Sequence, residues 1–503
     1  MTGSSTRNTA SRRMRQLLGR LAAQVGGSAR LQVIAILACV LALDAADKGT
    51  IGAVTPDLRQ DLGIDDTGIG ALVAVSSGAS ALAAIPVGWL TDRVNRVRLL
   101  AGSILLWSMA MATSALADSF QVLLFSRMAM GAVTATTGPT LASLVGDYFP
   151  LSERGRMYGF ILAGEMLGSG LGLIVLGDLA SWTSWRTSFW VLALIGLGLL
   201  YVVARRLPEP ERGGGSRTRT AGERHERREH DGGEAGTTGE EPPRRNDLVY
   251  ETIRRRAIEP QTALILKHDP ARMSLRQAVV YVLRVPTNRI MIIASAVGYF
   301  FFSGLRTFTV EFVTRHYGLS RVAVSGLIPI IGIGALAGVL SAGPLSDRLT
   351  ERGHLSGRVR MPAAAYIVSA ALFLPAITTT TVAMAIPLYT AAAFCLAATN
   401  PPLDAARLDV MHFRLWGRAE SVRTFLRMSS EASAPVLFGA VAGALGGGAG
   451  RADGLKYTFL IMLVPLVANG LILFTAGRTY PRDVATAMAS EARTRGAGER
   501  RDS

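Results

Sequence analysis

The sequence predicts an all-α membrane protein in which twelve transmembrane helices form two six-helix bundles. First, the chain of 503 residues is 49% hydrophobic and only 18% charged, which is the composition of a membrane protein and not of a soluble domain. Second, its apolar runs are long enough for helices that cross a bilayer, which takes about 20 residues each. Third, a short charged turn between two such runs, at residues 88–98, recurs at residues 343–352. This repetition indicates two similar bundles in tandem.

Residues 1–30 form a basic segment that we expect on the cytoplasmic side of the membrane. Apolar residues recur in it at helical spacing, at Met14, Leu17, Leu21 and Val25, with arginines between them. This pattern fits a short amphipathic helix on an anionic membrane face, and it equally fits a disordered positive tail that sets the orientation. The basic part is long, and no small-residue cleavage site follows a short apolar core, so the segment does not resemble a secretory signal.

Twelve membrane-length runs follow, six in an N-terminal bundle over residues 31–205 and six in a C-terminal bundle over residues 289–477. The N-terminal runs lie at residues 31–56, 67–91, 98–116, 119–146, 155–178 and 187–205. The C-terminal runs lie at residues 289–313, 321–346, 360–378, 380–403, 418–446 and 455–477. Pro387, Pro401 and Pro402 interrupt the tenth run.

Between the bundles, residues 206–288 form a central loop that we expect in the cytoplasm. Residues 211–245 are Gly, Glu, Arg and Thr with almost nothing apolar, which predicts a disordered and dispensable linker. Later in the loop, Ser274 followed by Gln277 has the capping-box pattern before an apolar stretch. A helix is therefore predicted there, lying along the cytoplasmic face of the membrane and ended by Pro286.

Basic residues concentrate in loops and tails on one side of the predicted spans, including residues 93–98, 348–360 and the tail at 478–503. The positive-inside rule then places both termini in the cytoplasm. These segments explain the net charge of +16, which therefore does not indicate a nucleic-acid partner. We expect an integral protein of the plasma membrane that acts as a monomer.

Four acidic residues lie about midway along predicted spans, where a charge is costly unless it is paired or hydrated. Asp44 and Asp47 share one face of the first span, and Glu165 and Glu431 lie in the fifth and the eleventh. All four are candidates for proton coupling. Lys48 is four residues after Asp44, so a structural pair between these two is the alternative, and it leaves Asp47 as the proton carrier. The two glutamates can instead be neutral, hydrogen-bonded packing residues.

Two arginines, Arg127 in the fourth span and Arg306 in the seventh, lie deep enough in the membrane to need partners. Each is a candidate to bind an anionic group of a substrate or to pair with one of the acids. Arg306 also has a local alternative, a pair with Glu311. The spans contain few of the Asn, Gln and Trp side chains that would surround a sugar, which favours an amphipathic substrate.

The charged turn at residues 88–98 resembles the signature loop of the major facilitator superfamily of transporters, G-x-L-x-D-R-x-x-R, and residues 343–352 carry a looser copy. The residues that carry the resemblance are Gly88, Asp92, Arg93 and Arg96, with Gly343, Asp347 and Arg348 in the second copy. The resemblance implies that they control a conformational switch. It also implies that Asp92 faces the N-terminus of the eleventh helix, where Arg423 and Arg427 are expected. Such a contact, partly exposed, contributes roughly 0.3–2 kcal/mol; the alternative is a solvated turn whose charge only sets orientation.

A finer resemblance is to Spinster-type lipid transporters, and it covers the first half of the chain best. It rests on Asp47-Lys48, Thr55-Pro56-Asp57-Leu58, Trp107-Ser108, Arg127 with Gly131, and Gly168-Ser169-Gly170-Leu171-Gly172, with Glu431 and Pro435 in the second half. The resemblance implies export of lysophospholipids or sphingoid compounds. That family usually has a glutamate in the fourth span where this chain has Thr134, which makes Thr134 a candidate substrate contact and implies a different route for protons.

These observations predict a secondary active transporter, not an enzyme, that moves a small or amphipathic solute by alternating access with coupling to protons. The expected partners are a small-molecule or lipid substrate, protons and membrane lipids. Proton-linked uptake of a sugar or organic acid is the first alternative, and a sensor or binding protein with a transporter fold is the second. No catalytic residue, metal site or cofactor is expected, because phosphate-binding, metal-binding and nucleophile motifs are missing and Cys39 and Cys395 lie in opposite halves.

Overall fold

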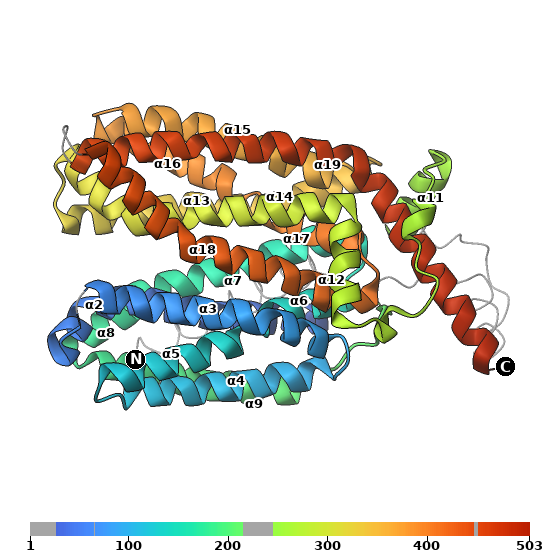
Figure 1. Cartoon of the computed structure of the whole chain (residues 1–503), viewed down its shortest axis with the longest axis horizontal. Helices are drawn as coiled ribbons and strands as arrows, with labels where there is room; N and C mark the ends of the chain where they lie inside the picture. The colour runs from blue at the N-terminus through green and yellow to red at the C-terminus, as the bar shows by residue number, and fades with distance from the viewer. Residues whose placement is uncertain (1–26, 65, 215–244, 447–450, 503) are drawn as a thin grey trace, which may run out of the picture.

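The computed structural model describes residues 27–64, 66–214, 245–446 and 451–502 of the chain. These residues form helices joined by short turns and loops (Figure 1). The segment in which an amphipathic N-terminal helix was predicted, and most of the predicted linker, lie outside the described residues.

The N-terminal half of the chain folds into six spans. They are α2 (Ser28–Leu62), α3 (Asp66–Thr91), α4 (Arg96–Ala115), α5 with α6 (Phe120–Thr134 and Thr137–Tyr148), α7 with the π-helical turn η2 and α8 (Arg154–Leu171, Gly172–Leu176 and Gly177–Trp182), and α9 (Trp185–Arg206). The fourth span is broken between α5 and α6. Pro139 explains the break, because it has no N–H for the carbonyl of Ala135 and its ring would clash with that carbonyl.

The C-terminal half repeats this plan. Its spans are α13 (Pro286–Tyr317), α14 (Arg321–Glu351), α15 (Gly357–Thr378), α16 with α17 (Val382–Ala397 and Asn400–Asp409), α18 (Trp416–Gly446) and α19 (Arg451–Asp502). The tenth span is broken because Pro401 and Pro402 cannot donate to the carbonyls of Ala397 and Ala398. The break therefore falls in the fourth span of each half.

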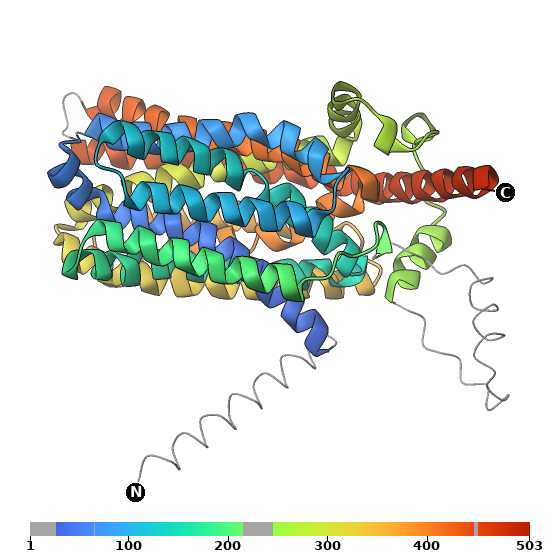
Figure 2. The same cartoon turned by 90° about the horizontal axis from the view of Figure 1, so that it is seen from below.

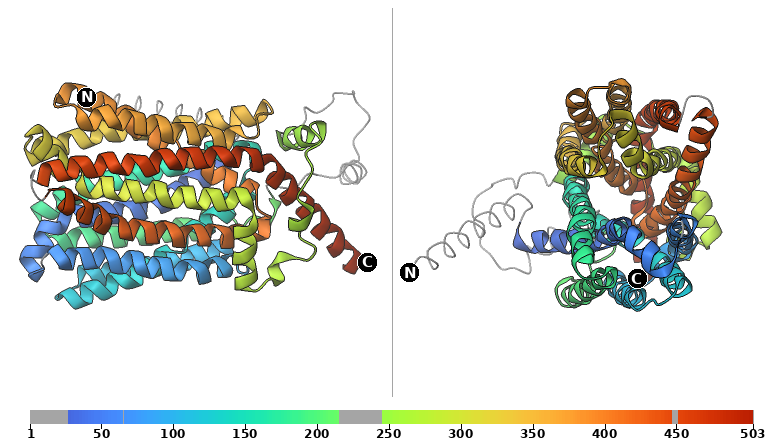
Figure 3. Two further views of the ribbon diagram at one scale, coloured as in Figure 1. Left: turned by 45° about the horizontal axis from the view of Figure 1, so that its top comes forward. Right: turned by 90° about the vertical axis from the view of Figure 1, so that its left-hand side faces the viewer.

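Ten of the described helices or continuous helical runs are long and apolar enough to cross a membrane. Of the other two spans, α5–α6 is divided by its break, and α18 carries several charged residues in its first half. Large apolar side chains such as Phe125 and Val464 are 69% and 68% exposed, which suits a surface that faces lipid. The protein is an integral membrane protein built from two six-helix bundles, which are seen end-on in Figure 3.

The two bundles approach most closely at one end of the molecule, where α3 stops and α18 starts (Figure 1). There, a side-chain carbon at Gly88 would collide with Ser421, and one at Gly343 would collide with the backbone of Gly155. We call this region, defined by these two contacts, the closed end. Toward the opposite end, the ribbons of the two bundles diverge.

Short elements and one long extension lie at and beyond the closed end. The central loop contributes α11 (Arg245–Arg255), the turns η4 (Thr262–Leu264) and η5 (Pro270–Arg272), and α12 (Leu275–Arg284), while η1 (Leu151–Glu153) and η6 (Phe413–Leu415) precede α7 and α18. Helix α12 begins with both hydrogen bonds of a capping box between Ser274 and Gln277, which confirms the helix predicted there. Helix α19 is 52 residues long and continues well past the other helices (Figure 2), so the residues after 477 extend the last span.

Candidate functional site

Asp92 lies just after α3, and its carboxylate contacts the start of α18 in the other bundle. Oδ1 accepts a hydrogen bond from the N–H of Gly417 (2.9 Å), and Oδ2 accepts from the backbone N–H and from Nε of Arg418 (3.1 and 2.7 Å). N–H groups in the first turn of a helix lack partners within the helix and form the positive end of its dipole, so a carboxylate is stabilised there. Burial raises the pKa of the Asp92 carboxyl above its ordinary value, although Arg418 and the two backbone N–H groups act in the opposite direction.

The side chain that pairs with Asp92 is Arg418, and not Arg423 or Arg427 as expected. These two arginines lie more than one and more than two turns farther along α18, where each pairs with an acid of its own helix. The expectation was wrong because only the first turn of a helix can reach a residue beyond its end. The Asp92 and Arg418 side chains are each 1% exposed, so the contact is also more buried than the sequence suggested.

Asp347, in the last turns of α14, makes the equivalent contact from the other bundle. Its carboxylate accepts hydrogen bonds from the N–H groups of Gly155 (3.2 Å) and Arg156 (2.7 Å), which begin α7, and it pairs with Arg358 (2.5 Å). The side chain of Arg348, expected to act with it, is exposed. Each bundle therefore places a carboxylate from its second span against the first turn of the fifth span of the other bundle.

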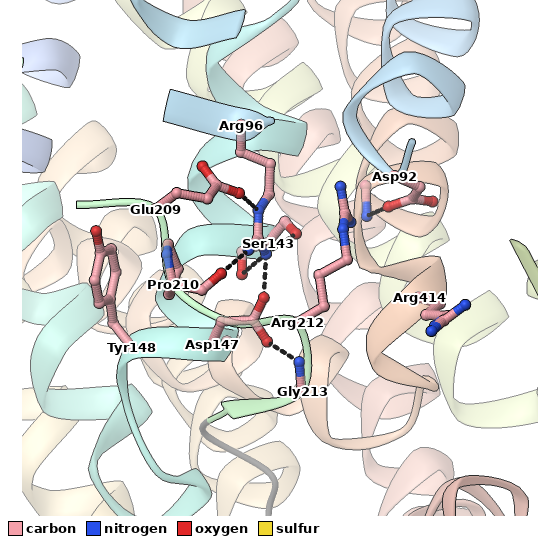
Figure 4. Close-up of polar contacts among 12 residues, drawn as sticks. Asp92, Arg96, Ser143, Asp147, Tyr148, Glu209, Pro210, Arg212, Gly213 and Arg414 are labelled. Carbon is pink, nitrogen blue, oxygen red and sulfur yellow. Dashed lines mark hydrogen bonds and ion pairs between the residues drawn. The ribbon is translucent and has the colours of Figure 1, made fainter. Parts of the chain in front are cut away.

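Arg96 fixes the charged turn inside the N-terminal bundle (Figure 4). Its fully buried guanidinium pairs with Asp147 and with Glu209 (2.8 Å from Nε), and it donates to Oγ of Ser143 (3.0 Å). Arg93, the other arginine of the turn, is exposed. The two arginines of the signature loop therefore differ in role: Arg96 is buried inside its own bundle, whereas Arg93 lies over the ring of Trp89 and donates to the carbonyl of Ala271 (3.1 Å) in the central loop.

The 209–213 segment, which follows α9, also holds this turn, and sequence reasoning missed it. Arg212 donates hydrogen bonds to the carbonyls of Thr91 (3.0 Å) and Val94 (2.8 Å). Figure 4 shows its side chain beside Asp92. Burial, and then the nearby charge of Arg96, lower the pKa of the Arg212 guanidinium. The sequence contained a signal, because the acid Glu209 and the base Arg212 directly follow the sixth span. Arg212 was nevertheless placed in the predicted linker because residues 211–245 are polar.

Arg127 of α5 pairs with Asp47 of α2 inside the N-terminal bundle. Nη1 of Arg127 lies 2.8 Å from Oδ1 of Asp47, Nη2 donates to Ser114 (2.8 Å), and the guanidinium lies 4.8 Å from the ring centroid of Phe189. Both side chains of the pair are 1% exposed. Of the two roles predicted for Arg127, the structure shows the pairing with an acid. The second oxygen of Asp47 has no hydrogen-bond partner among the described residues.

A second group of charges lies where α2 approaches α13 between the bundles. Nζ of Lys48 lies 2.7 Å from Asp44, which is the structural pair considered as an alternative above. Nη2 of Arg306 donates to the backbone carbonyl of Lys48 (3.2 Å), so a residue of the C-terminal bundle contacts the N-terminal one. Glu311, the local partner considered for Arg306, pairs with Arg315 (3.0 Å).

Two further spans add charges to this region. In α18, Nε of Arg427 lies 3.7 Å from Glu431, and the Arg427 guanidinium lies over the ring of Tyr299. Glu165 of α7 interacts electrostatically with Lys48 and with Arg427, one from each bundle. We call this group the central charged cluster; its members are Asp44, Lys48, Glu165, Arg306, Arg427 and Glu431.

Two other places lie outside this cluster. The hydroxyl of Thr134 donates to the carbonyl of Gly131 (3.1 Å) in the last turn of α5, next to the break of the fourth span. An apolar pocket lies between α13, α14 and α16, with Val313, Ile328 and Ile386 among its lining residues, and it contains no member of the central charged cluster. Unlike these two places, the central charged cluster brings together charged residues of both bundles.

Residues 37–435 match the Major Facilitator Superfamily. The probable L-galactonate transporter of Escherichia coli (strain K12) is 29% identical over 172 residues, which are 34% of this chain and 38% of that protein. Protein spinster homolog 1 of Homo sapiens is 30% identical over 189 residues, which are 36% of this chain and 35% of that protein. The matched region therefore spans less than half of these relatives.

Solved structures give the same fold over nearly the whole chain. A bacterial homolog of the human lysosomal transporter Spinster, in an inward-facing and unoccupied conformation, has a TM-score of 0.54 and 19% identity, covering 91% of this chain and 99% of that one. The human organic anion transporter MFSD10 (TETRAN) has a TM-score of 0.61 and 16% identity, covering 88% and 99%. Because the family match runs from α2 to α18 and the two-bundle fold agrees with it, the chain belongs to the Major Facilitator Superfamily.

Proposed function

We propose that the protein is a proton-coupled transporter of a small or amphipathic organic anion, which it moves by alternating access at the central charged cluster. The observation that carries this proposal is the environment of Arg306. Its exposed guanidinium makes one hydrogen bond to the described part of the chain, to the carbonyl of Lys48 in the other bundle. A guanidinium offers five N–H donors in a planar fork that fits a carboxylate or a phosphate, so most donors of Arg306 are available to an anion.

The other charges of the cluster suggest how an anion and a proton could be coupled. Two ion pairs account for four of its six charges. Glu165 and Arg306 remain without an ion pair to any described residue. An anion at Arg306 adds a negative charge and a proton on Glu165 offsets it, so binding both leaves the net charge of the cluster unchanged. Asp47, buried beside Arg127, is the second proton site that we propose.

The names of the relatives support the proposal of an anionic substrate. They include transporters of L-galactonate, of galactarate and D-glucarate, and of 4-hydroxybenzoate, and one structural neighbour is an organic anion transporter. The likeness to Spinster proteins favours a second candidate, an amphipathic lysolipid. Both candidates can carry an anionic group for Arg306, and they differ in the size of the apolar part.

We infer that the closed end faces the cytoplasm and that both termini lie on that side of the plasma membrane. Exposed arginines gather at the closed end, among them Arg98, Arg284, Arg348 and Arg360. The positive-inside rule assigns such an end to the cytoplasm. The structure would then represent the protein closed toward the cytoplasm.

Transport by the purified protein in proteoliposomes tests this proposal. Labelled galactarate, 4-hydroxybenzoate and lysophosphatidylglycerol are each offered with and without an inward proton gradient. Arg306→Gln should lower uptake of the accepted substrate about 10- to 100-fold below saturation, because hydrogen bonds to a charged group contribute about 1.5–3 kcal/mol. Arg315→Gln, on the same helix but paired with Glu311, is the matched control and should keep most of the uptake. Equal losses in both variants, or no uptake of any of the three anions, would contradict the proposal.

Glu165→Gln separates the proton from the anion. We expect this variant to bind the substrate but to lose the stimulation by a proton gradient, because an amide cannot take up the proton. Stimulation equal to that of the wild type would remove Glu165 from the coupling mechanism. Tight binding by the wild-type protein without any flux would instead favour a sensor with a transporter fold.

A further inference from the structure

We propose that helix α12 binds the headgroups of anionic phospholipids at the membrane surface beside the closed end. Helix α12 crosses the ends of α13 and α18 at a steep angle to the spans (Figure 1), and it lies at the outer edge of the molecule in the end-on view (Figure 3). The spans run along the membrane normal, so a helix with this direction lies in the plane of the membrane surface. The site is separate from the central charged cluster and does not depend on the substrate.

The two opposite faces of α12 differ in chemistry. Ala278 and Val282, four residues apart, are fully buried where the helix packs against α13 and α18. The face turned away from them displays Arg276, Val280 and Arg284, which also follow at intervals of four residues and are exposed. An apolar side chain between two arginines suits a membrane interface, because Val280 can enter the acyl boundary while the guanidinium groups reach the phosphates.

The charge around this face is positive and is not compensated by the protein. Helix α12 contains no acid. Neither Arg276 nor Arg284 forms an ion pair with any residue that the structure describes, and Arg289 in the first turns of α13 is exposed as well. Asp269, which precedes the helix, is engaged by Arg414. Phosphodiester groups of anionic lipids are the partner that matches such unpaired arginines at a membrane surface.

Helix α12 is held rigidly, so its arginines are presented in fixed positions. The capping box fixes its first turn, and the Tyr281 hydroxyl donates to the carbonyl of Leu264 (3.0 Å). Arg276 and Arg284 are then about 12 Å apart along the helix axis, which places them over different headgroups. The turn before the helix accepts a hydrogen bond from Arg418 through the carbonyl of Pro270 (3.1 Å). Lipids bound to α12 would therefore also steady the residue that pairs with Asp92.

Lipid binding to the full-length protein tests this site. The protein in neutral detergent is titrated with dioleoyl phosphatidylglycerol or dioleoyl phosphatidylcholine, and bound lipid is counted by native mass spectrometry. We expect the wild type to bind phosphatidylglycerol at least ten times more tightly. In Arg276→Gln/Arg284→Gln that affinity should fall roughly ten- to thirtyfold, because each basic residue near an anionic surface contributes about a fivefold factor. Binding of phosphatidylcholine should stay unchanged.

A matched control removes the same charge elsewhere. Arg254→Gln/Arg255→Gln changes two exposed arginines of α11, which lies beyond the ends of the spans (Figure 1), and it should keep the affinity within twofold. Equal losses in the two double variants, or no loss in Arg276→Gln/Arg284→Gln, would overturn the site. So would a wild type that does not prefer phosphatidylglycerol, or complete competition by inorganic phosphate at an equal concentration, which would indicate a site for free phosphate.

Val280→Glu provides a second variant that keeps both arginines. The new acid would lie between them and change the charge of this face by one unit, so the affinity for phosphatidylglycerol should fall about fivefold or more. Thermal unfolding in phosphatidylcholine shows whether each variant is folded. A folded Val280→Glu protein with wild-type affinity for phosphatidylglycerol would also overturn the proposal.

Discussion

Asp92 and Arg418 form a buried ion pair between the two bundles, with 2.7 Å between the carboxylate and Nε. The same carboxylate accepts hydrogen bonds from the first N–H groups of α18, so the contact forms only when α3 and α18 meet. Asp347 makes the same kind of contact with the first N–H groups of α7. Two carboxylates at the closed end, one from each bundle, therefore each cap a helix of the other bundle.

Asp347→Asn should make the closed end open more often. An amide keeps one acceptor oxygen but loses the charge that faces Arg358 and the start of α7. The lost hydrogen bonds to a charged group contribute about 1.5–3 kcal/mol, which raises the population that is open at this end about 10- to 100-fold. The measurement is the rate at which a membrane-impermeant maleimide modifies Thr424→Cys, introduced at a position that is 4% exposed here.

The labelling experiment uses a chain in which Cys39 and Cys395 are replaced. Glu251→Gln is the matched control, because it removes a carboxylate from an exposed pair with Arg255 in α11 and should leave the labelling rate unchanged. If the Asp347→Asn chain is modified no faster than the control chain, Asp347 does not hold the closed end.

Gly88→Ala should favour the open state for a steric reason. An added Cβ would meet Ser421 and would lie 2.7 Å from the carbonyl oxygen of Gly417, and both residues belong to α18 of the other bundle. Separation of the bundles relieves this strain, so Thr424→Cys should again be modified faster. Gly131→Ala is the control: its Cβ would meet the backbone of Ser76 within the same bundle, so it should lower the melting temperature without faster labelling. The reverse pattern would refute this reading of Gly88.

Asp47→Asn should destabilise the N-terminal bundle, because it leaves the buried Arg127 without its counter-charge. Removing one partner of a buried pair costs about 3–5 kcal/mol. Thermal unfolding measures the loss, and Asp47→Asn/Arg127→Gln, which removes both charges, should recover most of it. If the single variant unfolds at the same temperature as the double variant, the pair does not stabilise the bundle.

The same variant tests the proton role of Asp47. In liposomes, uptake by Asp47→Asn should lose at least part of its dependence on a proton gradient. An unchanged dependence would remove Asp47 from the mechanism and leave Glu165 as the proposed proton site.

The fold could be predicted from the sequence because each of its signals is local. Apolar runs of membrane length, their repetition in two halves and the prolines of the tenth span all appear within single segments. The break of the fourth span follows from one residue, Pro139, in the same way. The contact of Asp92 with the eleventh helix was predicted from the family resemblance. The predicted partners of Asp92, Arg423 and Arg427, were wrong because the arginine that reaches Asp92 depends on where this helix begins.

The contacts of the candidate site could not be predicted because they join residues that are far apart in the chain. Asp47 and Arg127 are separated by 80 residues, and Arg306 and Lys48 by 258. Periodicity within one helix shows which face a residue occupies, but it does not show which face of another helix packs against it. Arg212 was missed for the same reason, because its partners Thr91 and Val94 precede it by more than 110 residues.

The most direct test of this account is a distance measurement across the closed end in Asp92→Asn. Spin labels are attached at Arg98→Cys and Arg360→Cys, exposed positions of the two bundles, in a chain without native cysteines. Loss of the buried pair costs about 3 kcal/mol and should shift the ratio of open to closed protein about a hundredfold. The wild type should therefore show one short distance, and Asp92→Asn should gain a longer one, while affinity within each state stays near that of the wild type. If the distances stay unchanged while substrate affinity collapses, Asp92 binds substrate, and the account of the closed end is wrong.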